Sequence, residues 1–118
     1  MSVKIVDTFI ATIYVGFRDH YTKDICYYQE IYNYIQDYVD EVGLCVTVTK
    51  TEYVYTRGNE PGIIVGLINY SRFPSHQVDI EQHAITLGEK LRIKCKQMKV
   101  TIVMPDKTIM LYDPEDGK

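Results

Sequence analysis

Hydrophobic and polar residues alternate over residues 9–17 of the chain. A strand with one buried face has this period of two, because successive side chains of a strand point to opposite sides. The predicted strand places five apolar residues on one face: Phe9, Ala11, Ile13, Val15 and Phe17. The opposite face carries Ile10, Thr12, Tyr14 and Gly16.

Two later segments have the period of an amphipathic helix. In the first, apolar side chains share one face at Tyr28, Ile31, Tyr32, Ile35, Tyr38, Val39 and Val42. Thr22 or Asp24 can cap the start of this helix, and Gly43 can cap its end. In the second, the shared face holds Ile80, Ala84, Leu87, Leu91 and Cys95, and Ser75 can cap the start.

The remaining segments predict two hairpins. The first hairpin joins two segments that are rich in β-branched and aromatic residues, LCVTVTKTEYVYT and GIIVGLINY, and the turn between them is RGNEPG. VTIVM and TIMLY, joined around Pro105 and Asp106, form a second hairpin near the end of the sequence.

The order strand, helix, strand, strand, helix, strand predicts an α+β fold of the ferredoxin-like type. This is a two-layer βαββαβ sandwich, here with an added C-terminal strand. Two helices should cover one face of an otherwise antiparallel sheet, with strands one and three as parallel central neighbours. We expect a single domain over residues 1–118, with residues 1–8 as an edge extension or a free segment and residues 113–118 as a frayed tail.

Composition and charge narrow the function classes. A net charge of −3 argues against a broad nucleic-acid-binding face, because such affinity requires many neutralised phosphates. No run of about 18 apolar residues is present, so we expect no membrane span. Cys26, Cys45 and Cys95 cannot all pair and lack CxxC spacing, which favours a reducing, cytoplasmic location and a packing role for the cysteines.

The predicted topology brings two polar loops to one edge of the sheet, each running into a helix N-terminus. Unpaired helix N–H groups there would stabilise an anion, although polar loops can also be simple connections. The candidate ligand site comprises Arg18, His20, Tyr21, Lys23, Asn69, Tyr70, Arg72, Ser75 and His76. Arg57 lies at the opposite end of the predicted hairpin. We interpret GNEPG as a turn without chemistry, because phosphate-binding loops precede a helix.

No catalytic constellation is recognisable in the sequence. There is no GxSxG serine, no loop cysteine beside a histidine, and no HxH or HExxH spacing. We therefore predict no catalytic residues, no metal and no cofactor.

Tyrosine is the residue in excess, with 11 among 118 residues, and tyrosine brings large area and a hydrogen-bonding tip to interfaces. On the first helix, a stripe of Tyr27, Ile31, Tyr34 and Tyr38 is either a partner interface or the edge of the buried face. A second surface is the open sheet face. It would carry Tyr14, Thr47, Thr49 and Thr51, together with Ile64, Ile68 and Tyr70 or their neighbours.

These observations favour a small non-enzymatic binding or regulatory protein that contacts a protein partner and forms a homo-oligomer. A phage or mobile-element accessory protein that inhibits a host enzyme would have this size and acidity. The alternative is a small-anion or nucleotide-binding protein: a sensor, a sequestering protein or a phosphoester hydrolase. It would hold a phosphate-containing ligand between the two loops, with His20 or His76 as acid or base.

Overall fold

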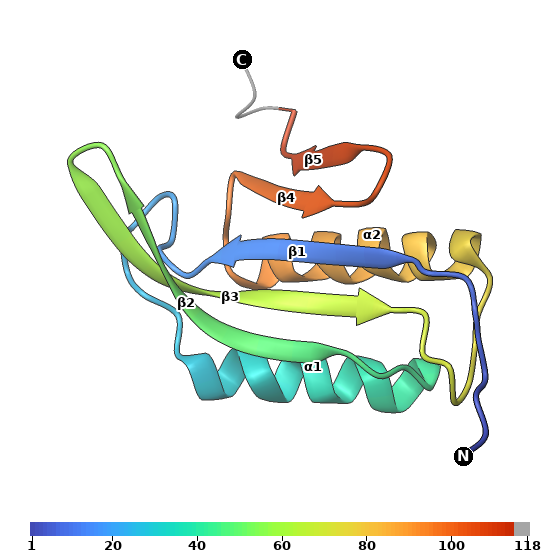
Figure 1. Ribbon diagram of the computed structural model, residues 1–118. Coiled ribbons are helices and arrows are strands. Elements are labelled where there is room, and N and C mark those ends of the chain that lie inside the picture. Colours follow the sequence, from blue (N-terminus) through green and yellow to red (C-terminus); the bar gives the residue numbers. More distant parts are fainter. Residues whose placement is uncertain (115–118) are drawn as a thin grey trace.

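The chain folds into two layers, in which a five-stranded antiparallel sheet is covered on one face by two helices (Figure 1). The computed structural model describes residues 1–114. The elements in chain order are β1 (Ile10–Gly16), α1 (Tyr28–Val42), β2 (Thr47–Tyr55), β3 (Gly58–Ile68), α2 (Gln77–Lys94), β4 (Lys99–Val103) and β5 (Thr108–Tyr112). The predicted α+β sandwich with an added C-terminal strand is confirmed. Most of the expected frayed tail, residues 115–118, lies outside the described residues.

The two central strands run in opposite directions. The sheet order is β2-β3-β1-β4-β5, and within it Ile10 pairs with Ile68 and Gly16 with Gly62. The prediction that β1 and β3 are parallel is therefore wrong. β3 follows β2 through a tight hairpin and reverses its direction, whereas the crossover through α1 leaves β1 and β2 pointing the same way.

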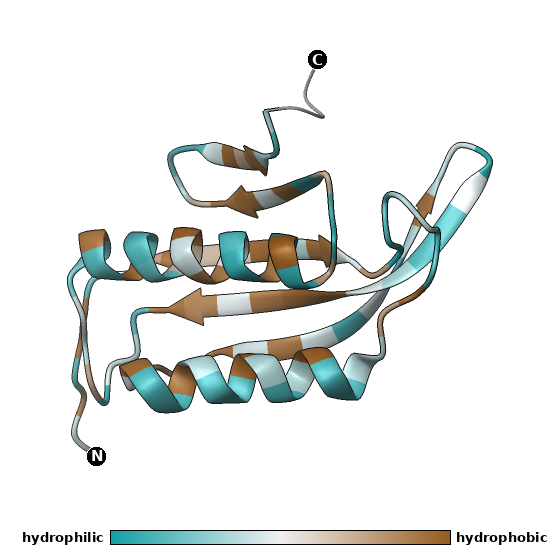
Figure 2. Ribbon diagram, turned by 180° about the vertical axis from the view of Figure 1, so that it is seen from behind, coloured by the Kyte–Doolittle hydropathy of each residue, from teal (hydrophilic) through white to brown (hydrophobic). Residues whose placement is uncertain are grey.

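Alternation along the strands decides which residues form the core. Ala11, Ile13 and Val15 of β1 are fully buried, and so are their partners Ile63 and Val65 on β3. Figure 2, seen from the helix side, shows hydrophobic colour along both strands beneath the helices. The predicted buried face of α2 is confirmed by its buried residues, which are Ile80, Ala84, Leu87, Leu91 and, at the helix end, Cys95.

The other face of the sheet is covered by no element among residues 1–114. The register places Ile64 and Ile68 on this face, because Ile63, Val65 and Leu67 point into the core. It also carries exposed apolar side chains from the neighbouring strands: Ile10, Val103, Met110 and Tyr112.

The ends of α1 differ in how well the sequence predicted them. The N-cap is Tyr27, with no side-chain capping bond, so neither Thr22 nor Asp24 has the predicted role. Residues 18–25 instead form a separate loop, closed by a bridge between its two ends. Gly43 confirms the predicted C-terminal cap, since it adopts the left-handed conformation at φ 72°.

Residues 1–8 pair with no strand. Of the two alternatives expected for this segment, an edge extension or a free segment, the strand pairing that an edge extension needs is not formed. The segment is tied to the fold at its end, where the Asn69 side chain donates a 2.8 Å hydrogen bond to the carbonyl oxygen of Asp7.

Candidate functional site

The two loops of the predicted ligand site lie at opposite ends of the sheet. Because β1 and β3 are antiparallel, the loop after Gly16 leaves one end and the loop after Ile68 leaves the other. Arg18, His20, Tyr21 and Lys23 therefore do not meet Asn69, Tyr70, Arg72, Ser75 and His76. The expectation of one shared anion site is corrected: each half has a separate environment.

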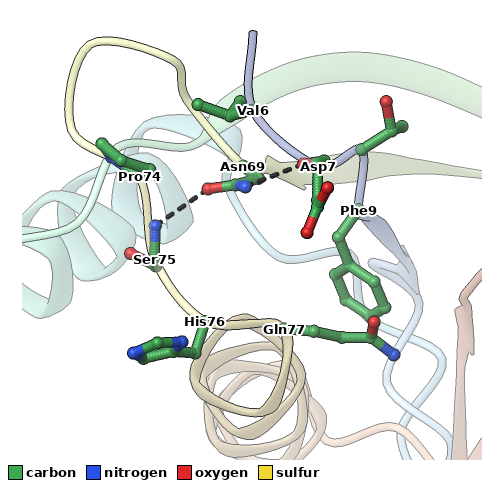
Figure 3. Close-up of a pocket in the computed structure, with 9 residues that line it drawn as sticks. Val6, Asp7, Phe9, Asn69, Pro74, Ser75, His76 and Gln77 are labelled. Carbon is green, nitrogen blue, oxygen red and sulfur yellow. Dashed lines mark hydrogen bonds between the residues drawn. The ribbon is translucent and has the colours of Figure 1, made fainter.

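The half that follows β3 surrounds a cleft of about 340 Å³ at the start of α2 (Figure 3). Asn69 crosses it, since its Nδ2 donates to the Asp7 carbonyl and its Oδ1 accepts the N–H of Ser75, both at 2.8 Å. His76, not the predicted Ser75, is the N-cap of α2, and it makes no side-chain capping bond. The polar side chain at the centre of this cleft is therefore engaged in joining two chain segments.

The half that follows β1 is a loop bonded largely to itself. The Arg18 guanidinium donates to the carbonyl oxygens of Lys23 at 3.3 Å and Asn59 at 3.0 Å. The Lys23 ammonium donates to the carbonyl of His20 at 3.0 Å. Both positive charges are thus bound to carbonyl oxygens, and within residues 1–114 neither forms an ion pair with a carboxylate.

Asp19 holds the same loop from inside. Its carboxylate accepts the main-chain N–H groups of Tyr21 at 2.8 Å and Thr22 at 3.2 Å. The bond from Tyr21 is the main reason that the pKa of Asp19 lies below its ordinary value, and burial opposes it. Lys96 adds an ion pair at 3.7 Å. Asp19 is thus fixed as an anion that organises the loop.

The first residues of β3 reach this loop, and the whole of GNEPG belongs to that strand, so our prediction that GNEPG forms the turn is wrong. Glu60 Oε2 accepts the main-chain N–H of Arg18 at 2.7 Å, and the Pro61 carbonyl accepts the N–H of Phe17 at 2.9 Å. Together they border a cleft of about 210 Å³. Its lining is mostly polar and charged: Arg18, Asp19, His20, Lys23, Tyr55, Glu60, Gln97, Met98 and Lys99.

Two glycines form the floor beside Glu60. Gly16 and Gly62 are cross-strand partners. A Cβ on Gly16 would lie 2.8 Å from the Glu60 carboxylate, and one on Gly62 would lie 2.4 Å from the Tyr53 ring. The two side chains therefore lie directly over the glycines on the open sheet face, in space that a larger residue would fill.

Tyr53 is the most strongly perturbed of these groups. Its hydroxyl donates a 2.8 Å hydrogen bond to the Ile63 carbonyl. Burial, with smaller contributions from the nearby Tyr14 and Glu60, raises the pKa of Tyr53 to about 12, although a hydrogen bond with the Val15 backbone opposes the rise. Tyr53 is therefore a neutral hydrogen-bonding group at physiological pH, and Glu60 is the adjacent negative charge.

Lys99 completes the charges at this end of the open face. Thr101 pairs with Tyr14, so Lys99, two residues before Thr101, lies on the same face, and it lines the cleft. The cleft is thus lined by a carboxylate from β3, an ammonium from β4 and residues of the Arg18 loop. A zwitterionic ligand, with one cationic and one anionic end, would suit this pairing.

We name Tyr53, Glu60 and Lys99, over the floor of Gly16 and Gly62, the glycine-floor site. These residues were not predicted from the sequence. The local signal was a glycine at the end of β1 and another within β3, and it becomes informative once the register pairs Gly16 with Gly62.

The tyrosine stripe on α1 is divided by burial. Ile31 and Tyr38 are core residues, 1% and 6% exposed, so they cannot contact a partner, and that part of the expectation is corrected. Tyr38 also hydrogen-bonds to His83 of α2 at 3.1 Å. Tyr27 is exposed and Tyr34 is half-buried, and their role in an interface stays a prediction.

Residues 1–114 contain no group of three His, Cys, Asp or Glu placed to hold a metal ion. No helix in this part of the chain combines the length and apolarity needed to cross a bilayer.

The fold and the cleft define a small two-layer α+β protein with a charged cleft at one end of its sheet. Two solved structures are similar to this chain over nearly its whole length. One is a phage SAM lyase in the apo state, with a TM-score of 0.75 and 16% identity, covering 90% of both chains. The other is a phage SAM lyase in complex with S-methyl-5'-thioadenosine, with a TM-score of 0.73 and 16% identity. That match covers 96% of this chain and 95% of the other.

At this identity the likeness shows a shared fold. No protein-family model and no curated protein sequence matches the chain.

Proposed function

We propose that this chain binds S-adenosylmethionine, or the thioadenosine derived from it, at the glycine-floor site and acts as a lyase on it. The observation that carries the proposal is the Glu60 carboxylate. It is held over Gly16 by the main-chain N–H of Arg18, beside a neutral Tyr53. A protein of the same fold binds S-methyl-5'-thioadenosine, which supports a ligand of this chemical class.

The chemistry of S-adenosylmethionine matches the charges of the site. The ligand carries a sulfonium cation, an α-ammonium group and a carboxylate on one flexible arm. Glu60 would attract the cationic groups, and the rings of Tyr14 and Tyr53 favour a cation near their faces. Lys99 would pair with the carboxylate.

The reaction needs few groups from the protein. Release of S-methyl-5'-thioadenosine breaks the bond between the sulfonium sulfur and Cγ of the amino-acid arm, and the electron pair goes to sulfur. The departing thioether is neutral and requires no proton donor. The carbon fragment completes its valence in one of two ways: its own carboxylate bonds to Cγ and closes a lactone, or a base such as water takes a Cβ proton and leaves an alkene. Neither route needs a nucleophilic residue of the protein.

Calorimetric titration of S-adenosylmethionine and S-methyl-5'-thioadenosine into the protein tests the proposal. We expect binding by the wild type and a loss of affinity for S-adenosylmethionine in Glu60→Gln. A hydrogen bond to a charged group is worth about 1.5–3 kcal/mol, which corresponds to roughly 10- to 150-fold in affinity. Chromatography of the same mixtures should detect released S-methyl-5'-thioadenosine with the wild type.

Glu52→Gln is the matched control. Glu52 lies on the same hairpin, one residue before Tyr53, so its side chain points to the opposite face of the sheet. This variant removes the same charge and should bind like the wild type. Failure of the wild type to bind either compound would reject the proposal, and equal losses in both variants would assign the effect to general charge.

A second candidate is contact with a macromolecule through the open sheet face, as a phage accessory protein. It is favoured by the exposed apolar side chains of Ile10, Ile68 and Met110 on that face. Ile68→Ser with Met110→Ser should then abolish capture of a host protein in a pull-down while leaving the melting temperature unchanged. Unchanged capture would remove this face from consideration.

A further inference from the structure

The main chain of Arg18 is bonded through both of its polar groups. Its N–H donates to Oε2 of Glu60 at 2.7 Å, and this bond holds the carboxylate over the glycine floor. Its carbonyl oxygen accepts a hydrogen bond from Nε2 of Gln97, also at 2.7 Å. A side chain 79 residues further along the sequence therefore holds the residue that holds Glu60.

Both N–H donors of the Gln97 amide are used within the protein. Besides Arg18, Nε2 donates to the carbonyl oxygen of Cys95 at 3.0 Å. Because both partners are carbonyl oxygens, the nitrogen of the amide must face them, and this nitrogen has two hydrogens to donate. Gln97 also lines the cleft. A ligand there cannot take these donors unless a bond to Arg18 or Cys95 breaks.

The end of α2 determines where Gln97 lies. The N–H of Lys96 donates to the Ile93 carbonyl at 3.1 Å, and the N–H of Gln97 donates to the Arg92 carbonyl at 2.9 Å. These are the two bonds of a Schellman motif, in which the residue after the C-cap is left-handed. Lys96 has this conformation, with φ 53°, at a position where glycine is the usual residue. The motif turns the chain so that Gln97 meets the loop after β1.

The same helix end binds the first three residues of that loop, which lies beside it at one end of the sheet (Figure 1). Gln97 donates to Arg18. The ammonium of Lys96 lies 3.7 Å from the Asp19 carboxylate, and the Lys96 carbonyl accepts the N–H of His20 at 3.1 Å. Since α2 is packed on the sheet through its buried face, these contacts tie the loop to the core.

We propose that Gln97 is a positioning residue for Glu60. By holding the Arg18 carbonyl it directs the Arg18 N–H toward the Glu60 carboxylate, and a hydrogen bond weakens steeply when its direction is lost. This role rests on the proposed function. It adds that Gln97 sets the preference for S-adenosylmethionine, which carries two cationic groups, over S-methyl-5'-thioadenosine, which carries none.

Hydrogen exchange of the Arg18 amide, followed by NMR, tests this support without a ligand. Gln97→Met has a side chain of similar length without a donor. In this variant the Arg18 amide should exchange roughly 5- to 10-fold faster, the factor for a bond worth about 1–1.4 kcal/mol. The Phe17 amide is the internal control, because it donates to the Pro61 carbonyl at 2.9 Å. An unchanged Arg18 rate, or an equal increase at Phe17, overturns the proposal.

Two further variants separate the hydrogen bonds from the side chain and the helix. Gln97→Glu keeps the shape of the side chain and removes the same two donors, so it should also speed exchange at Arg18. Gln82→Met removes an exposed glutamine from α2, whose amide bonds only to Thr86 at 3.5 Å among the described contacts. It should leave the Arg18 rate unchanged. Faster exchange at Arg18 in Gln82→Met would assign the effect to α2 as a whole and reject the role of Gln97.

Calorimetry of the same variants tests the preference. Gln97→Met should bind S-adenosylmethionine roughly 5- to 10-fold more weakly than the wild type does. It should bind S-methyl-5'-thioadenosine equally well, because this compound has no cation for Glu60. In a protein that already carries Glu60→Gln, Gln97→Met should cause no further loss, since both changes act through one carboxylate. Equal losses for the two compounds, or losses that add in the double variant, overturn the proposal.

Failure of the proposed function and failure of the positioning role give different results. If the wild type binds neither compound, the proposed function fails and the preference fails with it, while the Arg18 exchange rate still decides whether Gln97 supports Glu60. If the wild type binds S-adenosylmethionine and exchange at Arg18 is the same in Gln97→Met, only the positioning role fails.

Discussion

Replacing Gly62 with alanine should destabilise the protein and disturb the glycine-floor site. A Cβ at this position would lie 2.3 Å from the carbonyl oxygen of Val15 and 2.4 Å from Cε2 of Tyr53. The Val15 carbonyl belongs to a central strand and cannot move freely. The Tyr53 ring is held by its hydrogen bond to the Ile63 carbonyl, so relief of the clash requires that bond to break.

The magnitude follows from three contributions. Overpacking of this kind costs about 1–3 kcal/mol, and loss of the Tyr53 hydrogen bond adds about 1 kcal/mol. Replacing glycine restricts the unfolded chain and returns about 0.4–1 kcal/mol. We therefore expect a net loss of about 1–3.6 kcal/mol in the free energy of unfolding. With a denaturant slope of about 1–3 kcal/mol/M, the urea midpoint should fall by roughly 1 M.

Urea unfolding of Gly62→Ala and Gly66→Ala, followed by circular dichroism, separates this clash from the general effect of adding a methyl group to β3. Gly66 lies on the same strand and the same face, but its Cβ would meet only the side-chain hydroxyl of the exposed Thr47, at 2.5 Å. That hydroxyl can rotate away, so Gly66→Ala should change the midpoint little. Equal midpoints for the two variants would refute the reasoning.

Three further predictions concern the loops and the thiols. Asp19→Asn should lower the urea midpoint at pH 7. The folded-state pKa of Asp19 is depressed, chiefly by the N–H of Tyr21. The difference in urea midpoint between the variant and the wild type should therefore vanish as pH falls below about 3.9, the pKa of an aspartate in the unfolded chain, and through the lower folded-state pKa. A colorimetric disulfide reagent should react quickly with the exposed Cys45 and with the buried Cys95 only on unfolding, because burial raises the pKa of Cys95. The variant Cys45→Ser should lack the fast phase of this reaction. Arg72→Ala should leave ligand binding at the glycine-floor site unchanged in calorimetry, since the two lie at opposite ends of the sheet.

Local periodicity predicted the elements well, because burial of one face is a local property of each strand or helix. Alternation from Phe9 to Phe17 selected the residues that are buried in β1. Gly43 was identifiable as a cap because a left-handed residue at a helix end is nearly always glycine or asparagine. These features depend on residues close together in the sequence.

The predicted anion site failed on one long-range relation. Placing Arg18 and Arg72 together required β1 and β3 to run in the same direction, and the register shows that they run in opposite directions. The hairpin between β2 and β3 already implied this reversal, because β2 is parallel to β1 across the α1 crossover. The error therefore lay in combining two correct local predictions.

The glycine-floor site could not be predicted from any local motif. GNEPG has the composition of a turn, and Gly16 ends a strand, so each segment alone fits a connecting role. The two segments form a site only because Gly16 and Gly62 pair across the strands, which leaves room above the sheet for the Glu60 and Tyr53 side chains.

A reaction that expels a neutral thioether requires charge placement and no activated nucleophile. A protein that performs it can therefore lack every catalytic motif and still hold a working site. The absence of such motifs argued for a non-enzymatic protein when the sequence alone was considered. With the Glu60 carboxylate fixed over a glycine floor, the absence of catalytic motifs is compatible with catalysis. The assay for released S-methyl-5'-thioadenosine decides between a lyase and a non-enzymatic binding protein.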